Sequence, residues 1–167
     1  MNKLSFDEIK SGEEFEDLVA AYFRIIKNDE GNSLSDVQVK QSGKGSDGGR
    51  DILLVFELYD SIVRFQRKWV IQCKFLSKSS TGKSDIGDIN IPTLIHEYGA
   101  DGYLLIVRNE VTNELQSIFD ILNQSCKLGY KYEIWRGNQF LEFLEETPQT
   151  LIKRYFPKYY HQNNYKK

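Results

Sequence analysis

Apolar residues recur every three to four positions near the start of the chain, between residues 15 and 26. This spacing places them along one face of a helix, with polar residues on the other faces. Just before the stripe, Ser11 is followed three residues later by Glu14, which has the form of a capping box at a helix N-terminus. The pattern predicts an amphipathic helix whose apolar stripe consists of Phe15, Leu18, Val19, Tyr22, Phe23 and Ile26.

The spacing then changes to the patterns that are typical of strands. Residues 34–40 alternate apolar and polar side chains, residues 51–59 form an apolar run, and residues 68–75 form a third such segment. Residues 60–67 are interpreted as the connection between the second and third segments. Strand segments this close in sequence tend to pair, so the three are predicted to form a meander of adjacent antiparallel strands.

From residue 90 onward, helical and strand patterns alternate. Pro92 falls in the first turn of a helical segment and Gly99 ends it, which are positions that these residue types favour. The predicted segments are a helix at 90–98, a strand at 102–107, a helix at 112–129, a strand at 130–135, and closing helices at 138–146 and 148–156. This order predicts an α/β fold, a three-layer α/β/α sandwich with a central mixed sheet and helices on both of its faces.

The length of 167 residues suits one compact domain, which we assign to residues 1–157, with residues 158–167 as a polar tail or linker. No apolar run could cross a bilayer and the N-terminus lacks the apolar segment of a secretory signal, so we expect a cytoplasmic protein without membrane contact. The two cysteines are far apart in sequence, which indicates neither a disulfide framework nor a zinc site. The net charge of −2 disfavours a protein that coats nucleic acid, although a local basic face is compatible with it.

The stretch GSDGGRD, residues 45–51, holds more glycine and aspartate than a turn requires. Its Asp-Gly step alone is a common hairpin signal, but it leads into the apolar strand that begins at Asp51. On the predicted neighbouring strand, Gln72 and Lys74 share one face and Cys73 points the other way. A lysine on a buried strand is costly unless it is paired or functional. If the two strands pair, an acid, an amide and an ammonium meet near one end of the sheet, a combination suited to Mg²⁺ and a phosphate.

GSDGGRD followed downstream by QCK resembles the signature of the Mrr-type restriction endonuclease branch of the PD-(D/E)xK nuclease superfamily. The Phe15-Glu16 step in the first helix is similar to that family, and so is the alternation of helix and strand after the lysine. The resemblance covers roughly residues 11–145 in order and type. It implies a restriction-endonuclease-like three-layer fold and a metal-dependent DNA endonuclease.

The resemblance also implies a role for each matching residue. Asp51 would be the principal metal ligand, and Glu16 would add a second carboxylate from the first helix. Gln72 occupies the position that is Glu or Asp in most of the superfamily, and the backbone carbonyl of Cys73 would be a further ligand. Lys74 would orient or activate the attacking water and stabilise the transition-state phosphate. The residues alone leave blander interpretations open: a glutamate suits a helix start, and a lysine can extend into solvent from an edge strand.

Mg²⁺ is the implied cofactor, with Mn²⁺ as a substitute. Because Gln72 is neutral, Asp51 and Glu16 supply at most two negative charges, which favours one cation over two. Asp47 is expected nearby, where it holds the turn or assists the site. Four basic residues that flank the cluster are predicted to contact DNA phosphates, namely Lys44, Arg50, Lys78 and Lys83.

The predicted function is hydrolysis of phosphodiester bonds in DNA, in the setting of restriction or antiphage defence. One site cuts one strand, so cleavage of both strands implies a homodimer or higher oligomer, or sequential nicks; a fused or associated NTPase or sensor domain is a further expected partner. Two alternatives stay open. One is a catalytically inactive nucleic-acid-binding module of the same fold, and the other is a nuclease effector domain excised from a larger sensor protein. The two histidines, His96 and His161, are not assigned to catalysis.

Overall fold

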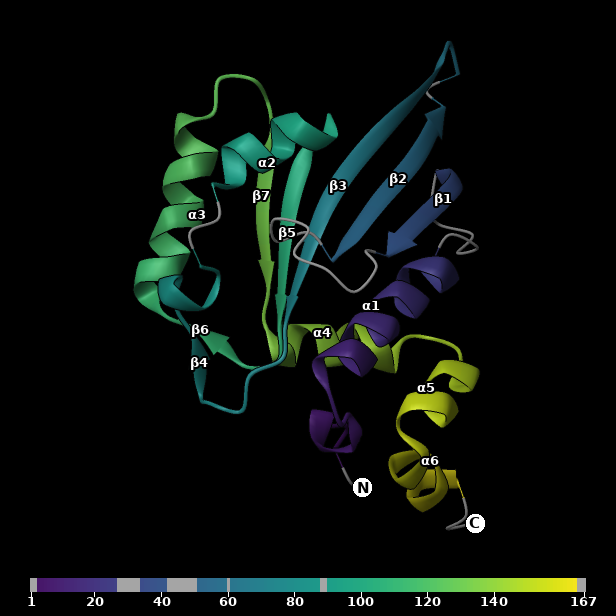
Figure 1. Ribbon diagram of the computed structural model, residues 1–167. Coiled ribbons are helices and arrows are strands. Elements are labelled where there is room, and N and C mark those ends of the chain that lie inside the picture. The colour runs from purple at the N-terminus through teal and green to yellow at the C-terminus, as the bar shows by residue number, and fades with distance from the viewer. Residues whose placement is uncertain (1–2, 27–33, 42–50, 60, 88–89, 165–167) are drawn as a thin grey trace.

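The computed structural model describes residues 3–26, 51–59, 61–87 and 90–164 in full, and of residues 34–41 the backbone alone (Figure 1). In this part of the chain the central sheet has the strand order β1-β2-β3-β5-β7. The strands span Leu34–Gln41 (β1), Ile52–Tyr59 (β2), Arg64–Lys74 (β3), Gly102–Val107 (β5) and Lys131–Trp135 (β7). β1, β2 and β3 are antiparallel neighbours, and β5 and β7 continue the sheet parallel to β3. The predicted meander and the mixed sheet are confirmed.

β3 begins earlier than the sequence predicted. Residues 60–67 were expected to be a connection, but Arg64 pairs with Tyr59, so β2 and β3 form one long hairpin that projects beyond the helices (Figure 1). The prediction was wrong because residues 64–67 are exposed and carry no pattern of buried apolar side chains.

Helices cover both faces of the sheet (Figure 1). One side carries α1 (Gly12–Ile26), α4 (Gly137–Glu145) and α5 (Gln149–Tyr155), and the other carries α2 (Ile91–Tyr98) and α3 (Asn113–Ser125). Side chains of β3 alternate between the two cores. Ile71 and Cys73 pack on the α1 side, and Val70 packs on the α2 and α3 side. The three-layer α/β/α sandwich is therefore confirmed. Among the described helices, none has the length and apolarity needed to cross a membrane.

The first helix starts where its capping pattern predicts. The Oγ of Ser11 accepts a hydrogen bond from the N–H of Glu14 over 3.1 Å, and a Glu14 carboxylate oxygen accepts one from the N–H of Lys10 over 2.7 Å. The first bond satisfies a donor that a helix start leaves unpaired, and the second ties the residue before Ser11 to the first turn. The helix then buries Phe15 and Leu18 in the core. Burial of Phe15 and Leu18 fixes the rotation of the helix about its axis, and this rotation sets the direction in which Glu16, the residue after Phe15, points.

The polar stretch at residues 77–85 contains two short elements. β4 (Ser80–Thr81) pairs in parallel with β6 (Glu110–Val111), and a 3-10 helix, η2, follows at Lys83–Asp85. The Thr81 hydroxyl is buried and donates to the Asn109 side chain over 2.8 Å. This small sheet lies outside the central one, below the ends of β3 and β5 in Figure 1.

The polar tail predicted after residue 157 is helical up to Asn164. α6 (Pro157–Asn164) follows α5, and its Tyr159 and Tyr160 pack against the α1-side core. A second 3-10 helix, η1 (Phe6–Glu8), ends at Glu8, whose carboxylate accepts hydrogen bonds from the N–H groups of Lys158 at 2.8 Å and Tyr159 at 2.9 Å. The helix in the predicted tail has no local sequence signal of this kind, because its cap comes from a residue about 150 positions earlier in the sequence.

Removing the Glu8 carboxylate is expected to loosen α6 without unfolding the domain. A lost capping interaction costs about 1 kcal/mol, so Glu8→Ala should speed amide hydrogen exchange in residues 157–164 by about fivefold. Asp7→Ala is the matched control, because the Asp7 carboxylate faces Arg108 at 3.6 Å instead of α6. Equal exchange in wild type and Glu8→Ala would show that the cap does not hold the helix.

Candidate active site

Asp51 is held against the strand that carries Gln72 and Lys74. Its backbone N–H donates to the carbonyl oxygen of Ile71 over 3.0 Å. Its carboxylate Oδ2 accepts a hydrogen bond from the N–H of Cys73 over 2.5 Å. The antiparallel pairing of β2 with β3 produces this arrangement. Ile52, the first residue of β2, pairs with Ile71, so Asp51 lies beside the C-terminal end of β3. Asp51 therefore lies beside the middle of the Gln-Cys-Lys sequence.

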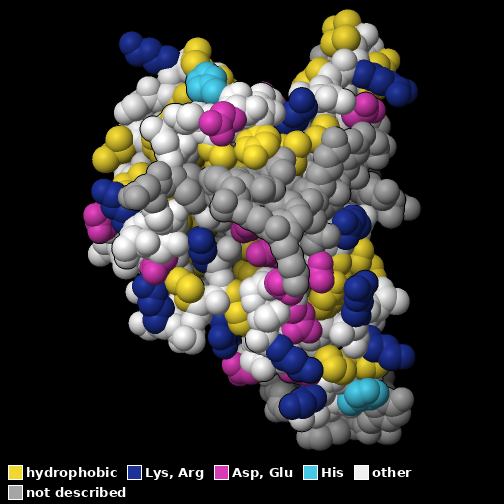
Figure 2. Space-filling view, in the orientation of Figure 1, with side chains coloured by type: hydrophobic (Ala, Val, Ile, Leu, Met, Phe, Trp, Pro, Cys, Tyr) yellow, Lys and Arg dark blue, Asp and Glu magenta, His cyan; other side chains and the backbone are white. Residues whose placement is uncertain are grey.

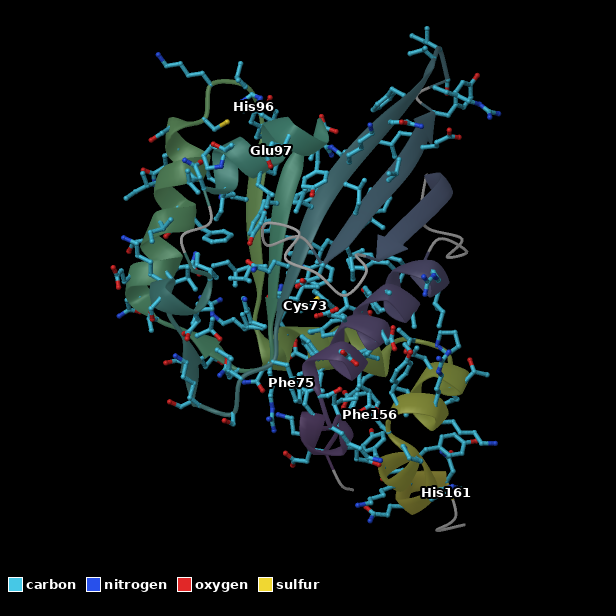
Figure 3. The ribbon with its side chains drawn as sticks, viewed as in Figure 1. Cys73, Phe75, His96, Glu97, Phe156 and His161 are labelled. Carbon is cyan, nitrogen blue, oxygen red and sulfur yellow. The ribbon has the colours of Figure 1, made fainter. Side chains whose placement is uncertain are left out.

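Cys73, the middle residue of that sequence, contacts Asp51 through its backbone N–H and not through its side chain. Cys73 is buried in the α1-side core, and in Figure 3 it lies where β3 meets α1. Burial, followed by the negative charges of Asp51 and Glu16, raises the pKa of the Cys73 thiol well above its ordinary value. The thiol stays protonated and is no nucleophile or metal ligand at neutral pH.

Gln72 points to the opposite side of the sheet and is only 2% exposed. Its side-chain oxygen Oε1 accepts a hydrogen bond from the hydroxyl of Tyr103 on β5. Burial raises the pKa of Tyr103, and the nearby charge of Asp51 raises it further, so the phenol keeps its proton. Tyr103 was not among the site residues predicted from the sequence. Its only signal was one hydroxyl in the otherwise apolar run GYLLIV, at a position that can share the α2-side face with Gln72.

The charges of Glu16, Asp51 and Lys74 act on one another. Burial raises the pKa of Glu16 to about 7, Asp51 adds to that rise, and Lys74 opposes it. Burial also raises the pKa of Asp51, against the opposing effects of the Cys73 N–H and the Lys74 ammonium. α1 thus brings Glu16 into the same region as the two residues from the sheet.

The chemistry of these groups suits one hard divalent cation. Asp51 and Glu16 offer two carboxylates, and the Gln72 amide and the Cys73 carbonyl on β3 are further oxygen donors beside Asp51; Mg²⁺ prefers oxygen donors with one or two carboxylates among them. Both carboxylates have raised pKa values, so a cation between them would relieve an unfavourable burial of negative charge. Within the described residues, no group of three or more His, Cys, Asp or Glu side chains forms a ready-made metal cage. Water and phosphate oxygens would have to complete the coordination of a bound ion.

Comparison with protein families decides the membership of the chain. The Mrr_cat model, described as a restriction endonuclease, matches residues 8–144. The chain belongs to this restriction endonuclease family. The matched span includes Glu16, Asp51 and the Gln-Cys-Lys sequence, so the resemblance predicted from those motifs is confirmed. The roles of the individual residues stay predictions.

A solved structure shows the same fold as this Mrr_cat family member. The restriction endonuclease MspJI, in complex with a 27-mer oligonucleotide, is similar with a TM-score of 0.52 at 14% sequence identity. That match covers 78% of this chain and 27% of MspJI. The DNA modification-dependent restriction endonuclease AspBHI gives a TM-score of 0.47 at 13% identity, with 86% of this chain and 38% of AspBHI covered. The chain thus spans well under half of either protein. No curated protein matches it in sequence.

The basic residues predicted to contact DNA fall into two groups. Lys44 and Arg50, together with Asp47, lie outside the described residues. Lys78 forms an ion pair with Asp85 at 2.6 Å, and Lys83 is exposed in η2. The hydrogen bond from Lys78 lowers the pKa of Asp85, and the charge of Lys74 adds a smaller effect, so this ion pair lies on the Lys74 side of the molecule.

Acidic and basic side chains are mixed over the lower half of the face in Figure 2. In the described part of that face they form no patch of a single sign. Phosphate contacts through Lys78 and Lys83 therefore stay a prediction, because a mixed distribution of charge is not the basic patch that is typical of a DNA-binding surface.

The two histidines lie far from the cluster. Figure 3 places His96 on α2, His161 on α6, and Cys73 between these extremes of the molecule. His96 packs its ring edge-on against Tyr130, with 5.5 Å between ring centroids. Their positions agree with a site that uses carboxylates and a lysine.

Titration of Glu16 should make the stability of the metal-free protein depend on pH. Its pKa is about 7 in the folded protein and 4.5 in the absence of its surroundings, so between these values the folded state binds a proton that the unfolded chain releases. The stability this proton gives is present below about pH 4.5 and is lost as pH rises through 7. Because the side chain is half-exposed, we expect about 1 kcal/mol, or a fall of about 2–4 °C in Tm.

The measurement is thermal unfolding in EDTA at pH 5 and pH 8. The fall in Tm between the two should be smaller in Glu16→Gln than in wild type. Glu142→Gln, an exposed glutamate of α4, is the control and should follow wild type. Parallel profiles for wild type and Glu16→Gln would contradict the raised pKa.

Proposed function

We propose that this restriction endonuclease family member is a Mg²⁺-dependent DNA endonuclease that hydrolyses phosphodiester bonds. The observation that carries the proposal is the position of Asp51, bonded to the backbone of β3 beside Lys74 and electrostatically coupled to Glu16. Asp51, Glu16, the Gln72 oxygen and the Cys73 carbonyl would hold the cation. Lys74 would contact the attacking water and the phosphate.

A cation held there would supply Lewis acidity to the phosphate and lower the pKa of the attacking water. In the proposed reaction the water oxygen attacks phosphorus and its proton passes to solvent, while the bond from phosphorus to the leaving oxygen breaks and that oxygen takes a proton from solvent. Lys74 orients the water and offsets the negative charge that develops on the phosphate oxygens. Asp51 and Glu16 balance the charge of the cation, and the hydrogen bond from the Cys73 N–H fixes the orientation of the Asp51 carboxylate.

The wider setting belongs to the same proposal. Mn²⁺ should substitute for Mg²⁺, because it takes similar oxygen ligands. Restriction or antiphage defence is the expected biological role, with a homodimer or higher oligomer where both strands are cut. The match covers only 27% of MspJI, which favours an arrangement in which a fused or associated NTPase or sensor domain directs the nuclease.

The direct test is incubation of the purified protein with supercoiled plasmid. We expect nicking with Mg²⁺ or Mn²⁺, none with EDTA, and weaker cleavage of single-stranded RNA of matched length. A protein that shifts DNA in a gel but leaves the plasmid intact with both metals would instead be the inactive binding module. Cleavage that persists in EDTA would contradict the cation-dependent mechanism.

A further inference from the structure

Gln72 can bind a cation through only one end of its side-chain amide, whereas a carboxylate at its position could bind through either end. The two ends of a carboxylate are both oxygens, but the two ends of a glutamine amide are an acceptor oxygen and a donor NH₂ group. A half-turn about the last side-chain bond exchanges them at almost no change in shape. If the NH₂ end faced a cation, two positive groups would meet, so a glutamine at a cation site needs something to select its orientation.

The buried hydroxyl of Tyr103 supplies that selection. Tyr103 has no exposed surface, Gln72 is 2% exposed, and the hydroxyl donates to Oε1 of Gln72. In the opposite orientation the NH₂ group of Gln72 would face the hydroxyl. The tyrosine proton would then lose its acceptor in a place without water, which costs about 1–3 kcal/mol.

The register of the sheet keeps the two side chains together. β5 pairs in parallel with β3, with Leu105 opposite Gln72. Tyr103 lies two residues before Leu105, so both face the α2 and α3 side, where Tyr103 also packs against Phe119 with 6.0 Å between ring centroids. The ring is fixed by the core, and the hydroxyl therefore has a fixed target.

We propose that Tyr103 is a positioning residue that holds the oxygen end of Gln72 in the orientation needed for cation binding. The carbonyl oxygen has two lone pairs: one accepts the Tyr103 proton, and the other stays available to the cation. This inference rests on the proposed function of the same site. It assigns Tyr103 the task of making a neutral amide serve where a symmetric carboxylate would need no such partner.

The experiment compares Tyr103→Phe in two backgrounds, the natural Gln72 and the substitution Gln72→Glu. The readout is the affinity for Ca²⁺ at pH 8, measured by calorimetry without DNA. In the Gln72 background we expect Tyr103→Phe to weaken Ca²⁺ binding about tenfold. In the Gln72→Glu background the same change should alter affinity by less than about twofold, because either carboxylate oxygen can face the cation. Rescue by the symmetric side chain is the result that a merely structural role would not give.

Tyr132→Phe is the matched control. Tyr132 lies on β7 in the same core cluster, and its hydroxyl contacts the Cys126 sulfur at 4.0 Å, away from Gln72. It should leave Ca²⁺ affinity unchanged in both backgrounds. An equal loss with Tyr103→Phe in both backgrounds, or no loss in either, would overturn the inference.

A second measurement needs no variant. In the NMR spectrum of the wild-type protein, the Tyr103 hydroxyl proton should exchange slowly with water. Fast exchange would overturn the inference even if Tyr103→Phe failed to fold. Failure of the proposed function looks different: wild type would bind no Ca²⁺ and cut no plasmid, whereas failure of this inference alone leaves binding and cleavage intact and insensitive to Tyr103.

Discussion

Replacing Asp51 by asparagine is expected to lower the rate of Mg²⁺-dependent plasmid cleavage by about 10³-fold while the protein stays folded. Asparagine keeps the shape of the side chain, and its oxygen can still accept the hydrogen bond from the Cys73 N–H. Only the negative charge is lost. Because burial raises the pKa of Asp51, its ionised form costs the folded state free energy at neutral pH. The Tm of metal-free Asp51→Asn should therefore equal or exceed that of wild type.

Asp101→Asn is the matched control for this change. Asp101 precedes β5 as Asp51 precedes β2, and its Oδ2 accepts a hydrogen bond from the Lys68 N–H over 2.8 Å, at the other end of β3. The same substitution there should leave cleavage within about twofold of wild type. Equal activity of Asp51→Asn and wild type would contradict the assigned site. An NMR titration adds a second readout: the pKa of Glu16 should fall from about 7 towards 4.5 when the charge of Asp51 is removed.

Replacing Lys74 by methionine is expected to lower the cleavage rate by about 10²- to 10³-fold through lost stabilisation of the transition-state phosphate. Asp51→Asn should weaken Ca²⁺ binding because it removes a carboxylate ligand, whereas Lys74→Met should not weaken it. The ammonium opposes the raised pKa values of both Glu16 and Asp51, and it also repels a divalent cation. Without it, Ca²⁺ should bind about as tightly as to wild type or up to about fivefold more tightly.

The control for Lys74→Met is Lys68→Met. Lys68 lies six residues earlier on β3, on the same face of the strand by the alternation of side chains, but beside Asp101 and away from the cluster. It should retain cleavage. A large loss of Ca²⁺ affinity in Lys74→Met would show that the lysine supports the fold of the site and not the reaction.

The strands that bury apolar side chains could be predicted from the sequence, and so could the neighbourhood of the site. Period-two spacing located β1 and an apolar run located β2, and the pairing of neighbouring strands brought Asp51 beside the Gln-Cys-Lys sequence as expected. These features depend on local spacing and on short connections, which a sequence displays directly.

Features that depend on distant partners could not be predicted. The exposed half of β3 is a strand because β2 pairs with it, and its own side chains carry no sign of that pairing. α6 is capped by Glu8 from the other end of the chain. The bond between Tyr103 and Gln72 depends on the parallel register of β5 with β3, which no local pattern fixes.

Cys73 links the interior packing of the protein to its chemistry. Its side chain fills space against α1 while its N–H holds the Asp51 carboxylate. A change of volume in that layer would thereby act, through one residue, on the position of the Asp51 carboxylate that is proposed to bind the cation. Substitutions selected in the α1 layer for a higher Tm would consequently also change the rate of the proposed cleavage reaction.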